Sequence, residues 1–295
     1  MDQKYNAMAP EDYMTHMFDF IPLENIPTKT DYLFINKGPN PEAYKVYDNI
    51  VAFSIEYPNC LILKGDNTHH YDMMGKQHKF IKFLTICPYS VDYFNKFYNF
   101  DKFQHVFLPF NLKFIPTPQE KTFDVFYVGN IPTPIDEIFP VMKKFKPCVV
   151  AFSGGTHPNQ TFVNKLNLNS QSKISIVHGL LRWCDTSTPD VFPDHEAFTL
   201  VKEYGIVPQF KMRTLEAAAC RSLILCKRDP WNHIEYYFEP DVDFLYWDKS
   251  DDLEEKINHI LNHYDDYIPM IENAYDKLIN NFTVECFFDK FLKNL

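Results

Sequence analysis

The sequence predicts an α/β protein with two Rossmann-like domains. Its 295 residues exceed the usual size of one domain and suit two domains of about 120 to 170 residues each. Short apolar runs alternate with helix-like segments along most of the chain, a pattern typical of open, mainly parallel sheets. Residues 111–121 contain two prolines and little periodicity, and we interpret them as the linker between the two domains.

The first predicted domain, residues 1–118, contains several short apolar runs of strand length. One helix is expected among them, because residues 90–97 begin with a polar entry and continue with helical spacing. The predicted strands are residues 32–36, 50–54, 61–63, 83–87 and 105–108.

The second predicted domain, residues 119–281, repeats the alternation with longer helices. The sequence Ser250-Asp251-Asp252 followed by Glu254 indicates the capped start of a long helix. The predicted strands are residues 125–128, 148–152, 174–178, 223–226 and 244–247. The other predicted helices are residues 135–145, 161–168, 194–204 and 216–220.

Composition narrows the class of protein. Hydrophobic residues make up 45% and aromatic residues 17% of the chain, enough for two cores, and the net charge is −10. That charge argues against a general nucleic-acid binder, which presents a basic face to phosphates, but it allows one local basic pocket. No apolar run approaches the ~20 residues of a membrane span, and the first residues lack the pattern of a signal peptide.

The seven cysteines indicate a reducing compartment. Their number is odd, they lie mostly in apolar runs, and none forms a Cys-x-x-Cys pair. We therefore expect a cytoplasmic protein. The excess of Phe, Tyr, Asn, Lys and Ile over Gly, Ala and Arg is typical of an AT-rich genome, which leaves the cytoplasm of a virus-infected host cell open as its location.

The segment 208–240 carries the strongest functional pattern. Lys211 and Arg213 precede Glu216 at the mouth of a small-residue helix, and a short apolar strand follows. Two cations can bind phosphates, with the arginine able to make a bidentate contact, while a carboxylate accepts hydrogen bonds from vicinal hydroxyls. This combination suits a sugar nucleotide, which carries both groups.

The segment resembles the C-terminal half of GT-B glycosyltransferases, in particular the group 1 and spore-coat CgeB-like branch. The resemblance rests on Arg213, Glu216-Ala217 and the turn Phe238-Glu239-Pro240, and it continues upstream in FDVFYVGN, residues 123–130. It implies two Rossmann-like domains facing a central cleft, with a terminal segment, residues 282–295, that packs back on the N-terminal domain.

The resemblance also implies an activity. The expected reaction moves a hexose or pentose from a UDP- or GDP-sugar to a hydroxyl of a glycan or glycoprotein acceptor. Lys211 and Arg213 would bind the diphosphate and Glu216 the ribose hydroxyls. No cofactor or metal is expected, because basic side chains and a helix N-terminus can take the place of a cation. Members of the family that retain the anomeric configuration often carry another glutamate eight residues before the one that matches Glu216. In this sequence that position is Pro208, which favours inversion.

Three strand ends are further candidates for binding the nucleotide-sugar. Gly129-Asn130 follows the predicted strand 125–128 and could bring backbone N–H groups close to phosphates. Ser153-Gly154 and His178 end two other predicted strands in the same way. Each could equally be an ordinary strand-to-helix connection, and none of them matches a P-loop or a Gly-x-Gly-x-x-Gly fingerprint.

The first domain is expected to supply a general base. We place it at Glu56, which follows the predicted strand 50–54, with His70 and Asp72, beside His69, as competing candidates. A metal site formed by these side chains with His78 is an alternative, although their spacing matches no zinc motif. Asp241-Val242-Asp243 resembles a metal-binding Asp-x-Asp pair, but a solvated turn explains it better.

Aromatic residues offer a further set of binding candidates. Trp183 and Trp231, on predicted loops, could stack on a sugar, whereas the aromatic residues at helical spacing in residues 93–103 are interpreted as core.

Two other functions remain compatible with the sequence. One is another enzyme class on the same scaffold, such as a sugar-nucleotide epimerase or a metal-dependent phosphate-ester hydrolase. The other is a non-catalytic protein that binds nucleotides or glycans. Dependence of turnover on an acceptor separates transfer from the first, and indifference to Glu56→Gln identifies the second.

Overall fold

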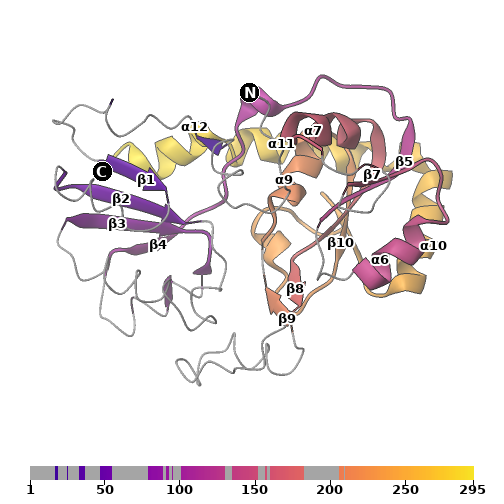
Figure 1. Ribbon diagram of the computed structural model, residues 1–295, viewed down its shortest axis with the longest axis horizontal. Coiled ribbons are helices and arrows are strands. Elements are labelled where there is room, and N and C mark those ends of the chain that lie inside the picture. Colours follow the sequence, from indigo (N-terminus) through magenta and orange to yellow (C-terminus); the bar gives the residue numbers. More distant parts are fainter. Residues whose placement is uncertain are drawn as a thin grey trace. The chain divides into compact units, whose positions relative to one another are not determined.

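The structure is a computed structural model and describes residues 17–18, 25, 33–36, 47–54, 79–88, 91–92, 95, 101–129, 135–151, 157, 160–182, 206–208 and 210–295. The chain divides into two compact units. One contains Met1–Phe18, Pro109–Arg182 and Pro208–Cys286, and the other contains Asp19–Leu108, Trp183–Val207 and Phe287–Leu295. Both are α/β units with parallel sheets, as the sequence predicts (Figure 1).

The smaller unit holds a parallel sheet in the order β1-β2-β3-β4. Its strands are β1 (Leu33–Asn36), β2 (Ile50–Ser54), β3 (Phe80–Thr85) and β4 (Phe103–His105). The first two lie where they were predicted. The other two begin earlier than predicted, because polar residues such as Lys82 and Gln104 occupy partly exposed positions and interrupt the apolar run. The predicted strand 61–63 lies outside the described residues.

Aromatic side chains form the core of this unit and anchor the end of the chain to it. The ring of Phe287 lies 5.3 Å from Phe53 and 5.6 Å from Phe107, both edge-on. Phe291, one turn later, lies 5.4 Å from Phe107. The segment predicted as a terminal helix is helical, as α12 (Val284–Phe287) followed by η5 (Phe288–Leu292). Phe103 packs 4.8 Å from Phe83, so it belongs to the core, as interpreted from the sequence.

The larger unit holds a parallel sheet in the order β11-β10-β7-β5-β6. Its strands are β5 (Phe123–Val128), β6 (Cys148–Ala151), β7 (Ser172–His178), β10 (Leu223–Lys227) and β11 (Leu245–Trp247). All of them overlap predicted strands. The remaining strands, β8 (Leu180–Arg182) and β9 (Ile206–Pro208), form a separate two-stranded sheet.

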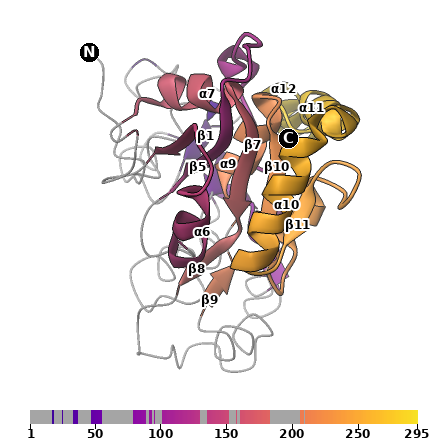
Figure 2. The same ribbon diagram turned by 90° about the vertical axis from the view of Figure 1, so that its right-hand side faces the viewer.

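Helices cover both faces of the five-stranded sheet (Figure 2). The helices are α6 (Ile135–Met142), α7 (Phe162–Ser170), α9 (Met212–Ala219), α10 (Ser250–Asn262) and α11 (Ile268–Asn281), with the short turns η2 (Leu112–Phe114), η3 (His233–Tyr236) and η4 (Tyr264–Tyr267). Ile138 of α6 and Ile257 of α10 pack on the face that carries Val125 and Ile174. The opposite face carries Phe126 and packs against Leu168 of α7.

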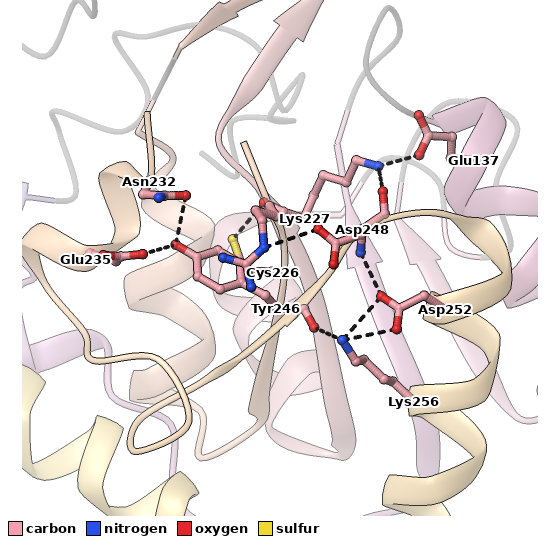
Figure 3. Close-up of polar contacts among 10 residues, drawn as sticks. Glu137, Cys226, Lys227, Asn232, Glu235, Tyr246, Asp248, Asp252 and Lys256 are labelled. Carbon is pink, nitrogen blue, oxygen red and sulfur yellow. Dashed lines mark hydrogen bonds and ion pairs between the residues drawn. The ribbon is translucent and has the colours of Figure 1, made fainter. Parts of the chain in front are cut away.

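The start of α10 is fixed to the end of β11 by charged side chains (Figure 3). Asp252 Oδ2 accepts a hydrogen bond from the Asp248 N–H at 2.7 Å, and Lys256 Nζ donates to the Tyr246 carbonyl at 2.6 Å. The helix, predicted as residues 251–263, runs from Ser250 to Asn262, and its N-cap residue, Lys249, makes no side-chain cap. Asp252 instead binds the backbone of the preceding segment.

The predicted linker, residues 111–121, is partly built into the larger unit. Phe110 N–H donates to the Phe282 carbonyl at 2.8 Å, and the ring of Phe114 packs 5.2 Å from Phe162. The compact units accordingly divide at Leu108, whereas the sequence placed the domain boundary at residue 118.

Candidate functional site

The carboxyl edge of the five-stranded sheet provides a place for a ligand between β5 and β7. In chain order the sheet runs 2-1-3-4-5, so the connections that leave β5 and β7 go to opposite sides of the sheet. Such a switch point opens a crevice at the carboxyl ends of its two strands. Gly129 follows β5 directly and His178 is the last residue of β7, so two of the predicted binding residues lie at this switch point.

Two polar groups lie within hydrogen-bond distance of the same ring nitrogen of His178. Its Nε2 lies 3.2 Å from the Tyr127 hydroxyl and 3.1 Å from Nη1 of Arg213. Because a guanidinium can only donate, Nε2 accepts and the proton of the neutral imidazole is on Nδ1. The guanidinium also lies over the ring of Tyr127, 5.7 Å from its centroid. Strand β5, strand β7 and helix α9 therefore meet through these side chains.

Gly129 leaves room for this arrangement of side chains. A Cβ atom at this position would lie 2.6 Å from the Tyr127 hydroxyl oxygen and 2.7 Å from Arg213 Nη1. Both distances are below van der Waals contact, so a side chain here would require the Tyr127 hydroxyl and the guanidinium to shift. The sequence prediction treated Gly129 as a backbone donor; its steric role toward Arg213 depends on the tertiary structure.

Lys211 adds a second basic side chain at the same helix start. It is the N-cap residue of α9, and its side chain makes no capping hydrogen bond. Burial lowers the pKa of Lys211 well below its usual range, and the neighbouring charge of Arg213 lowers it further. Among the residues that the structure describes, no carboxylate forms an ion pair with Lys211 or Arg213. An anion bound here would relieve that repulsion.

Glu216 lies one turn further into α9 and is buried, with 1% of its surface exposed. Its Oε1 accepts a hydrogen bond of 2.6 Å from Nζ of Lys165, on α7. Its Oε2 has no hydrogen-bond partner. The sequence reasoning expected a carboxylate open to ribose hydroxyls and did not anticipate the lysine, which lies 51 residues away along the chain.

A second pair of basic residues lies at the end of β10, in register with the site. Lys227 is the strand neighbour of His178. Its ammonium contacts Glu137 Oε2 at 2.7 Å and the Asp248 carbonyl (Figure 3). Arg228 Nε donates to Asp248 Oδ1 at 3.1 Å. These cations are neutralised within the fold, whereas the pair at the start of α9 has no carboxylate partner among the described residues.

The Asp-Val-Asp sequence that resembles a metal site is a structural turn. Asp243 is buried, and its Oδ2 accepts hydrogen bonds from the Glu239 N–H at 2.7 Å and from Lys277 Nζ at 2.5 Å. The prediction of a turn is confirmed, but the description of it as solvated is wrong for Asp243, because the carboxylate serves as an internal acceptor. The part of the chain that the structure describes contains no cluster of metal-ligating side chains.

The remaining predicted site residues cannot be placed. The candidates for the general base and two of the strand-end groups lie outside the described residues; these are Glu56, His70, Asp72, Asn130, Ser153 and Gly154, together with His69, His78 and Trp183. Trp231 is described and is partly buried, with its ring stacked 6.3 Å from His233.

Within the described residues, no helix is long and apolar enough to cross a membrane.

Sequence reasoning missed Tyr127 and Lys165. Tyr127 lies in the predicted strand 125–128 and was not singled out, although a hydroxyl on the penultimate strand residue, two positions before Gly129, indicates a polar end. Lys165 lies on a predicted helix, where an exposed lysine is the ordinary expectation, and its burial carries no local signal.

Comparison with known proteins agrees with this geometry. Residues 162–293 match the family described as "Glycosyl transferase-like". The fold is that of GT-B glycosyltransferases, since solved structures of this fold superimpose on most of the chain. The family match and the fold together support a glycosyltransferase.

Three solved structures illustrate the likeness. A glycosyltransferase from Rickettsia africae has a TM-score of 0.53 and 11% identity, with 88% of this chain and 75% of the other covered. HepE of Anabaena, solved in complex with UDP-glucose, has a TM-score of 0.57 and 10% identity, covering 86% and 74%. Sucrose-phosphate synthase from Thermosynechococcus elongatus has a TM-score of 0.52 and 9% identity, covering 80% and 64%.

This chain thus spans 64% to 75% of the length of these proteins. No curated protein matches the sequence.

Proposed function

We propose that this protein transfers a sugar from a nucleotide-diphosphate donor to a hydroxyl of a glycan acceptor. The donor is a UDP- or GDP-sugar carrying a hexose or pentose, and HepE, which shares the fold, was solved in complex with UDP-glucose. We propose cytoplasmic glycan synthesis as its setting, in a host cell if the protein is viral.

One observation carries the proposal. Lys211 and Arg213 have no carboxylate partner among the described residues, and they stand at the start of α9 beside the switch point marked by Gly129 and His178. Cations that repel each other in a partly buried place are costly to the fold unless an anion binds there. A diphosphate supplies that anion.

The same contact explains catalysis. Negative charge grows on the diphosphate as its bond to the sugar breaks, so a guanidinium and an ammonium stabilise the transition state more than the bound substrate. This takes the role that a divalent cation has in other transferases, and we propose that the reaction needs no metal. Arg213 offers several N–H donors in a fixed plane; one of them is directed at His178, and the others can donate to phosphate oxygens.

The acceptor hydroxyl must lose a proton to a base. We retain Glu56, with His70 and Asp72 as the competing candidates, as the proposed general base, and inversion as the preferred outcome. Glu56→Gln keeps the shape of the side chain and removes its basicity. It should abolish transfer and leave donor binding unchanged, whereas His70→Gln and Asp72→Asn serve as the matching tests of the competitors.

The first experiment measures binding of UDP, GDP and their common sugar conjugates to the purified protein, with and without EDTA. Stabilisation by one nucleotide series, unaffected by EDTA, is expected. Release of the nucleoside diphosphate only when a glycan acceptor is added then separates transfer from hydrolysis and from epimerisation. Failure of every nucleotide to bind, or binding only with a divalent metal, would overturn the proposal.

A further inference from the structure

The ion pair between Lys165 and Glu216 is the most deeply buried charge pair among the described residues. The exposed fraction of the side chain is 8% for the lysine and 1% for the glutamate, and Nζ lies 2.6 Å from Oε1. The same ammonium also makes a cation–π contact, since it lies 4.6 Å from the ring centroid of Phe162. Its position is therefore defined by α7, one turn from the start of that helix.

The pair leaves the carboxylate asymmetric. Oε1 is occupied by the ammonium, while Oε2 is buried and has no hydrogen-bond partner. A buried acceptor without a donor is unfavourable, and in native proteins such atoms have a water or a ligand as partner. Lys165 thus decides which oxygen of Glu216 remains to accept a hydrogen bond.

Helical geometry relates this acceptor to the anion site. Glu216 follows Arg213 by three residues on α9, and side chains three apart in a helix are neighbours about 5 to 6 Å apart. Helices α7 and α9 each precede a parallel strand of the same sheet, so both begin at its carboxyl edge. A molecule with phosphate at Arg213 and hydroxyl groups one helical turn away would meet both side chains.

We infer that Lys165 is a positioning residue of the donor site, which holds Glu216 so that Oε2 accepts a hydroxyl of the nucleoside. The inference rests on the proposed function and extends it to a residue that does not touch the ligand. A lysine with only a structural role would change the stability of the fold. A positioning lysine also changes how well the protein distinguishes a ribonucleotide from its deoxy form.

The test compares the affinity of the purified protein for UDP and GDP with that for dUDP and dGDP, which lack one ribose hydroxyl. The wild-type protein is expected to bind the ribonucleotide about ten-fold more tightly than its deoxy form, because a hydrogen bond to a charged acceptor is lost. In Lys165→Met the two affinities should agree within about two-fold, since the carboxylate is no longer held. Lys165→Arg keeps a charged donor and should retain the preference.

Two further variants keep the test decisive. The double variant Lys165→Met with Glu216→Gln removes both charges of this pair, so it is expected to fold where the single variant does not, and it should show the same loss of preference. Lys121→Met is the matched control. That lysine also joins α7 to the residues that follow α9, through the carbonyls of Ser170 and Arg221, but it forms no ion pair with the carboxylate of Glu216. It should lower stability and leave the preference for the ribonucleotide unchanged.

The outcomes are distinguishable. A wild-type protein that binds neither UDP nor GDP overturns the proposed function and this inference with it. A wild-type protein that binds one of them without preferring the ribonucleotide, or a folded Lys165→Met protein that keeps the wild-type preference, overturns the inference and leaves the proposed function standing. The expected result is that Lys165→Met and the double variant lose the preference for the ribonucleotide and that Lys121→Met retains it.

Discussion

Two pairs of basic residues, at the start of α9 and at the end of β10, differ in how their charges are neutralised. Lys227 and Arg228 end a strand, and each has a carboxylate partner, Glu137 at 2.7 Å and Asp248 at 3.1 Å. These ion pairs connect β10 to α6 and to the segment after β11. Both charges are therefore neutralised by carboxylates within the fold.

The pair at the start of α9 has a different environment. Arg213 donates to the neutral ring of His178, and Lys211 has no ion-pair partner among the described residues. The lesson is that position at the edge of a sheet does not make a cation a ligand-binding group. What distinguishes the pair at the start of α9 is that no carboxylate among the described residues neutralises it, so an incoming anion gains more of the interaction there.

The largest expected effect separates the two arginines directly. Arg213→Ala should weaken binding of the donor nucleotide by about 1 to 3 kcal/mol, because a charged hydrogen bond to phosphate is lost. Arg228→Ala, the matched control, should change it by less than about 0.5 kcal/mol, since that side chain is paired and partly exposed. Isothermal titration calorimetry measures both. Equal losses of nucleotide affinity in the two variants would contradict the distinction between the two basic pairs.

Gly129→Ala tests whether the place of Arg213 matters as well as its charge. The new methyl group would overlap the Tyr127 hydroxyl and the guanidinium, so nucleotide affinity should fall by about 1 to 2 kcal/mol. Tyr127→Phe in the same chain removes one of the two overlapping atoms and should recover part of the loss. A Gly129→Ala protein that binds as the wild type does would contradict the close packing around this residue.

Lys211 predicts a pH dependence. Its pKa is lowered by burial and by Arg213, so above the lowered pKa the unliganded side chain is neutral, and a bound anion raises the pKa again. Binding therefore takes up a proton, and affinity for the nucleotide should fall as the pH rises above the lowered pKa of the unliganded Lys211. Lys211→Met should bind more weakly and lose this dependence. If the affinity of Lys211→Met still depends on pH in the same way, another titratable group is responsible for the dependence.

The smallest effect is expected at the neutralised pair. Lys227→Met removes the ion pair to Glu137 but keeps apolar contact with the ring of Trp247, which its ammonium covers at 4.5 Å. Urea denaturation should give a loss of about 0.5 to 1 kcal/mol in the free energy of unfolding. Nucleotide affinity should be unchanged. A clear loss of affinity would place Lys227 in the binding site and weaken the comparison of the two pairs.

Local pattern predicted most of the larger unit. Strand β10 is an apolar run up to Lys227 because both of its faces are covered, and its bounds agree closely with the prediction. Strand β7 begins at Ser172, before the predicted residue 174, because its first two residues are polar. The smaller unit was predicted less well, since Lys82 and Gln104 lie inside strands at partly exposed positions and no local signal shows which neighbours leave room for them.

By itself the sequence determined the α/β class, the order of the elements, and the candidates Gly129, His178, Lys211 and Arg213. These follow from hydrophobic periodicity and from residue types at strand ends, which are local properties. Only the tertiary structure decided which charges meet. Lys165 reaches Glu216 across 51 residues of chain, and Arg213 reaches His178 across 35. A charge becomes a binding group or a structural one according to its counter-charge, and counter-charges are brought together by packing between distant segments.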